Sequence, residues 1–262
     1  VRRLNQLTGP FILRRMKSEV LKELPPKTEN VYRIELEEEQ RKLYLAAVVD
    51  AREKLRAAKP EDKMAVFAVL MRLREICCDP RLIADNWTGG SAKLDACIEL
   101  VTSAVEGGHR ILLFSQFTSM LELLAKRLDA EGVSHFTLQG STPKPVRAEL
   151  VRRFNGGEAS VFLISLRAGG TGLNLTAADI VIHYDPWWNV AAQNQATDRA
   201  YRIGQRNPVQ VYKLIAQDTI EEKIVELQQA KQDLAETVTG SADGAILRMK
   251  PEELLNLLEG TE

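Results

Sequence analysis

The sequence predicts an α/β fold, in which helices cover both faces of a doubly wound parallel sheet. Three observations predict it. From Lys93 onward, short apolar runs alternate with helical patterns of about 10–15 residues, as in parallel strands joined by crossover helices. The runs are apolar throughout, which is typical of strands buried on both faces. Glycines and small polar residues follow several of them, at the strand ends where such sheets bind ligands.

The first ninety residues predict a mainly helical region. Residues 1–33 are basic and follow a helical pattern that Pro25-Pro26 ends. Residues 31–36 alternate like a short strand. Residues 37–78 are again helical, with a break near Lys59-Pro60. The segment from Asp79-Pro80 to Asn86–Gly90 predicts a loop and a domain boundary.

The predicted sheet follows this boundary. A helix over residues 93–105 leads through Gly107-Gly108 into the first apolar strand. Ser119 and Glu122 have capping-box spacing at the start of the next helix, and Gly132 closes that helix. The predicted strands cover residues 111–114, 136–138, 161–164, 180–184 and 209–216, with a further helix over 146–154.

The C-terminal segment predicts a helix over residues 219–236, with Thr219 and Glu222 in capping-box spacing. Its apolar stripe indicates packing across the surface of the domain. Gly240 and Gly244 precede a short amphipathic stretch, Pro251–Leu258, which carries no functional signal.

Composition limits the classes of protein. The chain is 45% hydrophobic and 27% charged, as in soluble globular proteins, and has no run of 18 apolar residues that would span a membrane. The three cysteines form no C-x-x-C pair and the three histidines are scattered, so we expect reduced cysteines, an intracellular protein and no metal site. Without a signal peptide or an initial Met, the sequence looks like part of a longer protein.

Charge is unevenly distributed along the chain. The formal net charge is −1, which argues against a nucleic-acid-binding surface over the whole protein. Residues 140–206 nevertheless hold eight Lys and Arg against five acids, whereas residues 217–262 hold four against eleven. This distribution permits a local phosphate-binding face.

The most informative motif is Gln195-Ala-Thr-Asp-Arg199-Ala-Tyr-Arg202-Ile-Gly-Gln205. Arginines three residues apart lie on one face of a helix, and guanidinium groups bind phosphate oxygens in pairs. We therefore predict that Arg199 and Arg202 act on a transferring phosphoryl group. The alternative is a solvated, salt-bridged helix face that includes Asp198.

A glycine-rich segment, Ser165-Leu-Arg-Ala-Gly-Gly-Thr-Gly-Leu-Asn-Leu175, follows a predicted strand directly. Its backbone N–H groups could bind an anion, although a structural turn explains the glycines equally well. It is not a Walker A motif, because the chain has no Gly-Lys-Ser/Thr. It is not a dinucleotide fingerprint either, since Leu175 stands where Gly or Ala is needed.

Three further strand ends carry candidate groups. Ser115-Gln116 and Gly140-Ser141-Thr142 supply hydroxyl and amide groups that suit phosphates, although turns and helix caps use the same residues. Asp185-Pro-Trp187-Trp188-Asn189 pairs two tryptophans. We expect one of them in the core and the other at a partly open functional surface.

The order of these motifs, F-S-Q-F, G-S-T-P, S-L-R-A-G-G-T-G-L-N-L, D-P-W-W-N and Q-A-T-D-R-A-Y-R-I-G-Q, closely resembles the second motor lobe of superfamily 2 helicases. Within them it resembles the SWI/SNF-type DNA translocases, in a bacterial or archaeal-like form, over roughly residues 91–236. Residues 13–27 and 73–82 are similar to the inter-lobe segments of that family. Arg167, Tyr201, Val190 and Cys78-Asp79 depart from the usual Lys, His, Pro and Asn-His.

The resemblance implies two RecA-like lobes with ATP and Mg²⁺ between them, bound mainly by a first lobe that holds the Walker A lysine and the catalytic acids. It makes Arg199 and Arg202 arginine fingers and brings Gly172, Asn174 and Gln195 near the nucleotide. It implies that DNA is held by its backbone, without sequence preference. The residues that the resemblance assigns to DNA are Ser115, Gln116, Gly140, Ser141, Thr142, Ser165, Arg167, Gly169 and Gly170.

The resemblance also implies a division of the chain, with the cytoplasm and nucleoid or the nucleus as its location. Residues 1–33 would end the first lobe, 34–90 form a helical linker, 91–216 the second lobe, 217–238 a brace helix and 239–262 a tail. We expect negligible ATP hydrolysis by this chain alone. An RNA helicase lobe and a non-catalytic DNA- or protein-binding platform remain alternatives.

Overall fold

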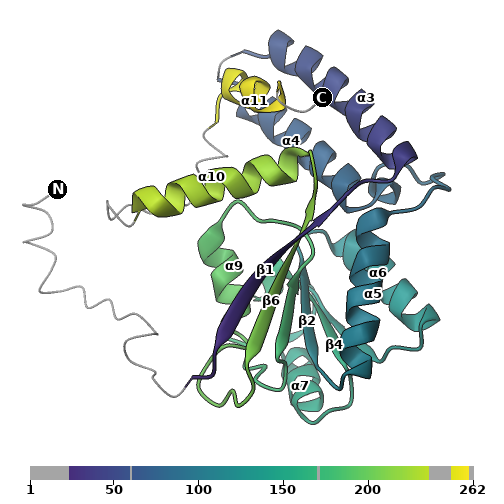
Figure 1. Cartoon of the computed structure of the whole chain (residues 1–262), viewed down its shortest axis with the longest axis vertical. Coiled ribbons are helices and arrows are strands. Elements are labelled where there is room, and N and C mark those ends of the chain that lie inside the picture. The colour runs from purple at the N-terminus through teal and green to yellow at the C-terminus, as the bar shows by residue number, and fades with distance from the viewer. Residues whose placement is uncertain (1–23, 60, 170–171, 236–248, 260–262) are drawn as a thin grey trace, which may run out of the picture.

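The computed structural model describes residues 24–59, 61–169, 172–235 and 249–259. Their centre is a six-stranded sheet in the order β1-β6-β5-β2-β4-β3, and every strand pairing is parallel (Figure 1). The α/β class with a doubly wound parallel sheet is confirmed. The strands are β1 (Lys27–Ile34), β2 (Ile111–Ser115), β3 (His135–Leu138), β4 (Val161–Ser165), β5 (Ile180–His183) and β6 (Val209–Ala216).

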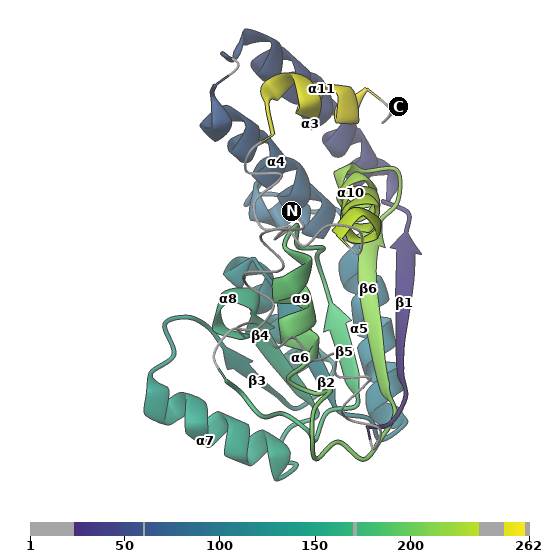
Figure 2. The ribbon, with the colours of Figure 1, turned by 90° about the vertical axis from the view of Figure 1, so that its left-hand side faces the viewer.

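Helices cover both faces of the sheet (Figure 2). On one face, α5 (Ala92–Glu106) and α6 (Thr118–Ala130) pack on alternate residues of the strands, including Ile111 and Leu113. On the other face, α7 (Lys144–Asn155), α8 (Leu166–Gly169) and α9 (Val190–Thr197) pack on the intervening strand residues, which point to the opposite side of the sheet and include Leu112 and Phe114. All five residues of β2 and of β4 are buried, as continuous apolar runs predict.

Strand β1 lies in this sheet, at its edge, beside β6. It pairs in register from Lys27 with Val209 to Ile34 with Ala216. We predicted a strand over 31–36, so the strand begins and ends earlier than expected. Residues 27–33, which we predicted to belong to the end of a first lobe, form most of β1 in this sheet. The basic helical pattern predicted before them lies outside the described residues.

A second core lies above the sheet (Figure 1). The hairpin of α3 (Glu38–Ala57) and α4 (Lys63–Cys78) forms it, with the 3-10 turn η2 (Pro80–Leu82) after α4. Helix α4 begins at Asp62, whose side chain accepts from the backbone N–H of Ala65 at 3.0 Å. Helices α10 (Ile220–Ala235) and α11 (Pro251–Leu258) complete this core, so the C-terminal stretch without a functional signal has a packing role.

The two predicted capping boxes differ from the observed helix starts. Helix α6 begins before Ser119, and Phe117 is its N-cap without a side-chain hydrogen bond. The Ser115 hydroxyl accepts from the Phe117 N–H at 3.1 Å, so a strand residue orders this start. At α10, the Glu222 carboxylate accepts from the N–H of Asp218 rather than from that of Thr219. Gly132 does close α6, with φ +67°.

Candidate functional site

The carboxyl ends of β2, β3, β4 and β5 meet at one edge of the sheet, where a groove of about 750 Å³ opens. Residues that follow these strands form one side, and α4 forms the other with Phe67 and Met71. The groove therefore brings together candidates that lie far apart in the sequence. Its lining includes Gln116, Gly140, Ser141, Ser165, Arg167, Trp187, Trp188 and Gln195.

Ser115 and Gln116 have different environments. Ser115 is 1% exposed, and its hydroxyl donates to Oδ1 of Asp185 at 2.6 Å. This hydrogen bond occupies the hydroxyl in the interior. The Gln116 side chain lines the groove, where its Nε2 lies 3.7 Å from Sδ of Met71. Of the two, Gln116 is the residue whose side chain can reach a ligand.

The turn after β3 exposes Gly140 and Ser141. Thr142 closes it, because its hydroxyl accepts from the N–H of Gln139 at 3.0 Å and its own N–H donates to the Gln139 carbonyl at 3.1 Å. Thr142 thus orders the turn, while Gly140 and Ser141 line the groove. Ser and Thr hydroxyls commonly stabilise turns by hydrogen-bonding to nearby backbone groups in this way.

The segment after β4 begins as one helical turn, α8, and not as the loop that we expected from its glycines. The Ser165 hydroxyl accepts from the N–H of Ala168 at 3.3 Å, in the manner of a helix cap. Arg167 is exposed and lines the groove. Gly169 ends α8, and the predicted DNA contact at Gly170 lies outside the described residues.

The arginine pair does not lie on a helix, which corrects the sequence-based prediction. Helix α9 ends at Thr197, and residues 198–204 form turns and bends. The turn is held by tertiary contacts, since the Arg199 carbonyl accepts from the N–H of Leu175 at 3.0 Å. The buried Gln205 side chain also donates to the carbonyls of Ala178, at 2.7 Å, and Ala200, at 3.2 Å. These donors occupy the Arg199 and Ala200 carbonyls and thereby fix the backbone in a non-helical path.

The two guanidinium groups nevertheless lie close enough to interact. Burial lowers the pKa of Arg199, which is 8% exposed, and the neighbouring positive charge of Arg202 lowers it further. Arg202 is half-buried, and its Nη1 donates to the Leu173 carbonyl at 3.4 Å. Two like charges that repel each other favour an anion between or beside them. The arrangement suits a phosphate.

The three residues predicted near the nucleotide are separated. Gln195 is exposed in the groove. Gly172 and Asn174 are exposed on the segment that precedes β5, and neither belongs to the described lining of the groove. The Asn174 carbonyl accepts from the Asn155 side chain at 2.8 Å, which ties this segment to α7. Gly172 has φ +31° and open space around it.

The tryptophan pair differs from the prediction of one core and one surface residue. Trp187 and Trp188 are both half-buried, both line the groove, and their rings stack with centroids 4.5 Å apart. Phe67 from α4 packs edge-on against Trp188 at 6.0 Å. The pair forms an aromatic wall between the helical hairpin and the sheet.

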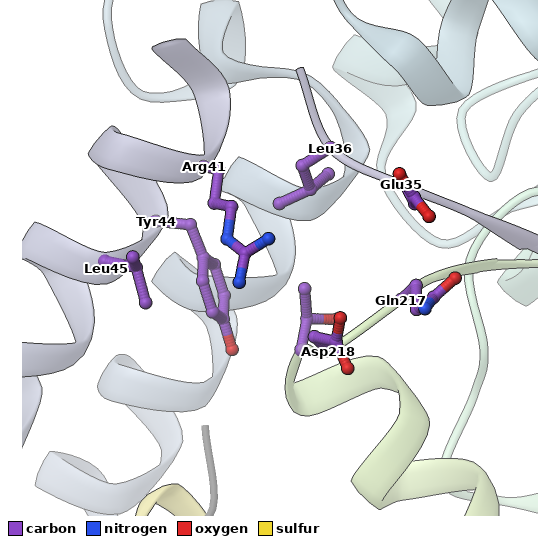
Figure 3. Close-up of a pocket in the computed structure, with 8 residues that line it drawn as sticks. Glu35, Leu36, Arg41, Tyr44, Leu45, Gln217 and Asp218 are labelled. Carbon is purple, nitrogen blue, oxygen red and sulfur yellow. The ribbon is translucent and has the colours of Figure 1, made fainter. Parts of the chain in front are cut away.

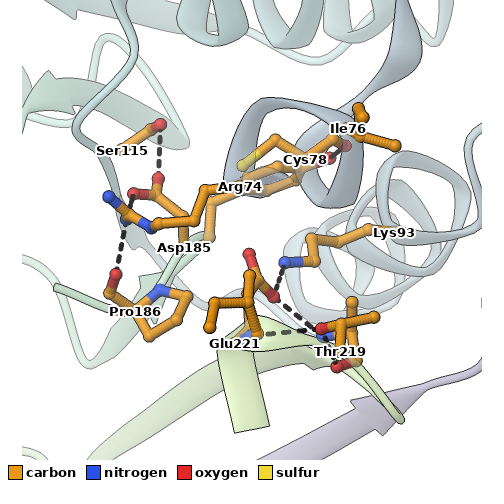
Figure 4. A network of polar contacts seen from close by, with 12 residues as sticks. Arg74, Ile76, Cys78, Lys93, Ser115, Asp185, Pro186, Thr219 and Glu221 are labelled. Carbon is orange, nitrogen blue, oxygen red and sulfur yellow. Dashed lines mark hydrogen bonds and ion pairs between the residues drawn. The ribbon is translucent and has the colours of Figure 1, made fainter. Parts of the chain in front are cut away.

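Sequence reasoning missed Arg74, which lies behind this wall. Arg74 is completely buried, and its Nη2 donates to Oδ2 of Asp185 at 3.0 Å and to the Pro186 carbonyl at 2.6 Å (Figure 4). Its guanidinium carbon lies 4.8 Å from the ring centroid of Trp188. The available signal was that Arg74 shares a helix face with the apolar Leu70 and Cys78, four residues away on either side, since a charged residue on such a face is rarely buried without a partner.

A smaller cavity lies where α3 meets the turn between β6 and α10 (Figure 3). Its volume of about 20 Å³ is enough for a single water molecule but not for a nucleotide. Arg41 and Tyr44 line it from α3, and Asp218, with φ +55°, lines it from the turn. The large groove is therefore the better candidate for a macromolecular ligand.

Comparison with known proteins identifies the family. The sequence profile of the helicase conserved C-terminal domain matches residues 92–204, and that of the SNF2-related domain matches residues 1–82. An uncharacterized ATP-dependent helicase of Mycoplasma genitalium is 38% identical over 261 residues, which are 98% of this chain and 25% of that protein. The chain belongs to the SNF2-related helicase family. It has the RecA-like fold of SNF2 ATPase domains and corresponds to their C-terminal motor lobe.

Other SNF2-related proteins support this assignment. The human SWI/SNF-related matrix-associated actin-dependent regulator of chromatin subfamily A member 1 is 36% identical over 98% of this chain and 26% of its own length. The Sulfolobus solfataricus SWI2/SNF2 ATPase core in complex with dsDNA superposes with a TM-score of 0.75 at 31% identity, over 99% of this chain and 55% of that one. The chain spans about a quarter of the length of the curated relatives that it matches.

Two further observations concern the described residues of this SNF2-related chain. No helix among them is both long and apolar enough to cross a bilayer. Within the same residues, His, Cys, Asp and Glu side chains form no group of three or more that could hold a metal ion.

Proposed function

We propose that this chain is the second motor lobe of an ATP-dependent translocase that moves along double-stranded DNA. In this proposal Arg199 and Arg202 are arginine fingers for ATP bound to the first lobe of the same protein. The observation that carries the proposal is that Arg199 and Arg202 lie on one turn fixed by Gln205, where the charge of Arg202 adds to burial in lowering the pKa of Arg199. A finger must be held in place before the charge of the transition state develops.

The groove at the strand ends is the proposed DNA-binding surface. Gln116, Ser141 and Arg167 come from three different strand ends and converge on it. Amide, hydroxyl and guanidinium groups bind phosphate oxygens without selecting a base sequence, as a translocase requires. Ser115, Thr142 and Ser165 support these residues through hydrogen bonds to neighbouring backbone or side-chain atoms. DNA bound by the related Sulfolobus core is consistent with this surface.

ATP use follows from the family, and we propose that Mg²⁺ and the phosphates are held mainly by the first lobe. Mg²⁺ would neutralise charge on the phosphates during their transfer. The residues of this chain then bind and orient the far side of the nucleotide. Gly172 and Asn174 are exposed for such a contact, whereas Gln195 lies in the groove and is placed equally well to contact DNA.

The domain division belongs to the same proposal. Residues 91–216 form the second lobe together with β1, and residues 34–90 form a helical linker above it. Helix α10 would act as the predicted brace helix of residues 217–238, and the segment 239–262, which we predicted as a tail, includes α11 with its packing role. The protein would act wherever its DNA lies, in the cytoplasm and nucleoid or in the nucleus.

Arg202→Ala in the intact protein tests the proposal. We expect DNA-dependent ATP hydrolysis to fall by about 10³-fold or more, the contribution of an arginine finger, while DNA binding stays unchanged. Arg206→Ala is the matched control, because Arg206 is exposed a few residues further along the same turn. Near-normal turnover by the Arg202 variant would refute the finger assignment. Comparing stimulation of the unmodified protein by duplex DNA and by RNA separates this proposal from an RNA helicase.

A further inference from the structure

Arg74 connects the helical hairpin to the strand ends of the sheet. It lies on α4, and its Nη2 donates both to Asp185 and to the Pro186 carbonyl, in the segment that follows β5 (Figure 4). The guanidinium packs against the rings of Trp188, at 4.8 Å, and Phe117, at 5.5 Å. One side chain therefore contacts three parts of the molecule that border the groove.

Asp185 extends this connection to β2. Its Oδ1 accepts from the Ser115 hydroxyl at 2.6 Å and from the backbone N–H of Gln116 at 3.2 Å, while its Oδ2 faces Arg74. The position of Gln116 in the groove thus depends on the carboxylate that Arg74 holds. Both charged side chains are almost completely buried.

The chemistry of Arg74 suits positioning better than simple packing. Among the described residues, its Nε and Nη1 have no hydrogen-bond acceptor, so the buried charge is only partly compensated. Apolar residues often fill such a position at no loss of stability. A planar guanidinium, however, can hold a carboxylate and a carbonyl while it stacks on an aromatic ring, which no apolar residue can do.

We propose that Arg74 is a positioning residue for the DNA-binding groove. It fixes the groove residues of α4, such as Phe67, relative to Gln116 and the tryptophan pair, without touching DNA itself. This inference rests on the proposed function, because it assumes that the groove binds DNA.

The test compares Arg74→Lys with two reference variants in the intact protein. Lysine keeps the charge but cannot hold Asp185 and Pro186 while stacking on Trp188. Arg72→Lys is the matched control, since Arg72 is exposed on the same helix. Arg167→Gln removes a charge that we place against a phosphate. The measurement is the dissociation constant for duplex DNA as a function of salt concentration.

Arg74→Lys should weaken DNA binding on the order of tenfold, because the groove contacts lose their alignment. The slope of log affinity against log salt should stay as in the unmodified protein. Arg167→Gln should instead lower the magnitude of that slope by about 0.9, the value for one phosphate contact. A slope change in Arg74→Lys, or unchanged affinity, would overturn the inference.

Ser115→Ala provides a milder second variant on the other side of Asp185, in case Arg74→Lys does not fold. It should weaken DNA binding less and again leave the salt slope unchanged, and normal affinity would count against the inference. If the unmodified protein itself shows no affinity for duplex DNA, the proposed function fails instead. Thermal unfolding of each variant establishes that its affinity is measured on folded protein.

Discussion

The ammonium of Lys93 in α5 contacts the carboxylate of Glu221 in α10, and both side chains are completely buried. The same carboxylate accepts from the N–H of Ala216 at 2.8 Å, at the end of β6. Burial lowers the pKa of Lys93, but the Glu221 carboxylate, together with the neighbouring Cys78 and Cys77, raises it above its usual value, so the amine stays charged. The pair joins α10 to α5 and to the end of β6.

Replacing one partner of this pair should destabilise the protein strongly. Lys93→Met leaves the Glu221 carboxylate buried without its counter-ion, which costs about 3–5 kcal/mol in comparable cases. The double variant Lys93→Met, Glu221→Leu should recover most of that loss, because neither charge remains. The free energy of unfolding in urea measures both effects. Lys42→Met, at an exposed ion pair on α3, is the control and should change little. Equal losses in the single and double variants would contradict the prediction.

His183 should make the stability of the protein fall in mild acid. Burial lowers its pKa from 6.5 to about 3, with help from Lys213, so the ring stays neutral in the folded state. Its Nε2 lies 2.9 Å from the Thr197 hydroxyl. The unfolded chain takes up a proton below about pH 6.5 and the folded chain does not, so stability present above that pH is lost as pH falls toward 3.

The measurement is the free energy of unfolding between pH 6.5 and pH 5, where about 2 kcal/mol should be lost to this group. His183→Gln can still hydrogen-bond but cannot titrate, and its stability should lack that part of the pH dependence. The Glu29 carboxylate contributes at lower pH than this window. At Glu29, burial raises the pKa, but hydrogen bonds from Lys213 and Lys27 lower it to about 2. Identical pH profiles for His183→Gln and the unmodified protein would show that the histidine does not carry the effect.

Most of the fold could be predicted because its signals are local. Continuous apolar runs such as residues 111–114 and 161–164 became buried strands within one residue of the predicted bounds. Strand β1 was harder, since seven of its eight residues are exposed at the sheet edge and only its pairing with β6 defines it. The alternation over residues 31–36 indicated only part of this strand, because residues 27–30 become strand through that pairing alone. Helix α11 likewise acquires a role only through its contacts with α3.

The site was predictable as a set of motifs but not as a geometry. Spacing suggested a helix for Arg199 and Arg202, but side-chain and long-range hydrogen bonds hold a turn there, such as the one that the Gln205 side-chain amide donates to the Ala200 carbonyl. From the sequence, the Ser115 hydroxyl was as good a candidate for a phosphate contact as the Gln116 amide. In the structure it donates to the Asp185 carboxylate in the interior. Arg74 was missed because its partners follow it by about a hundred residues in the chain.

Helix α11 should contribute to stability through Leu254. This side chain is completely buried in the core formed by α3, α4 and α10, and Arg52 of α3 donates to the Leu258 carbonyl at the end of α11 at 2.5 Å. Leu254→Ala should cost about 2–5 kcal/mol, as large-to-small core changes do. Asn256→Ala is the control on the exposed face of the same helix. Chemical denaturation compares the two, and equal stability would mean that α11 is not docked in solution.

In the proposed function, catalysis is divided between two lobes. The 262-residue chain contains no Gly-Lys-Ser/Thr, so it has no P-loop lysine to hold the phosphates of ATP. Its arginines can stabilise a transition state only when another surface presents the nucleotide. We therefore expect ATP hydrolysis by the isolated chain to stay at background, with or without DNA. Clear DNA-stimulated turnover from this chain alone would contradict the proposed function.

Adding a separately produced first lobe provides the complementary measurement. If the lobes act together, the mixture should hydrolyse ATP in a DNA-dependent manner, and the rate should rise with the concentration of either lobe, because their association becomes bimolecular. The Arg202→Ala chain should fail to restore turnover, whereas the Arg206→Ala chain should succeed. That difference would show that the Arg202 variant has lost the contribution of its side chain to hydrolysis and not the ability of the lobes to associate. Arg206 tests this because it lies four residues from Arg202 in the same ordered segment.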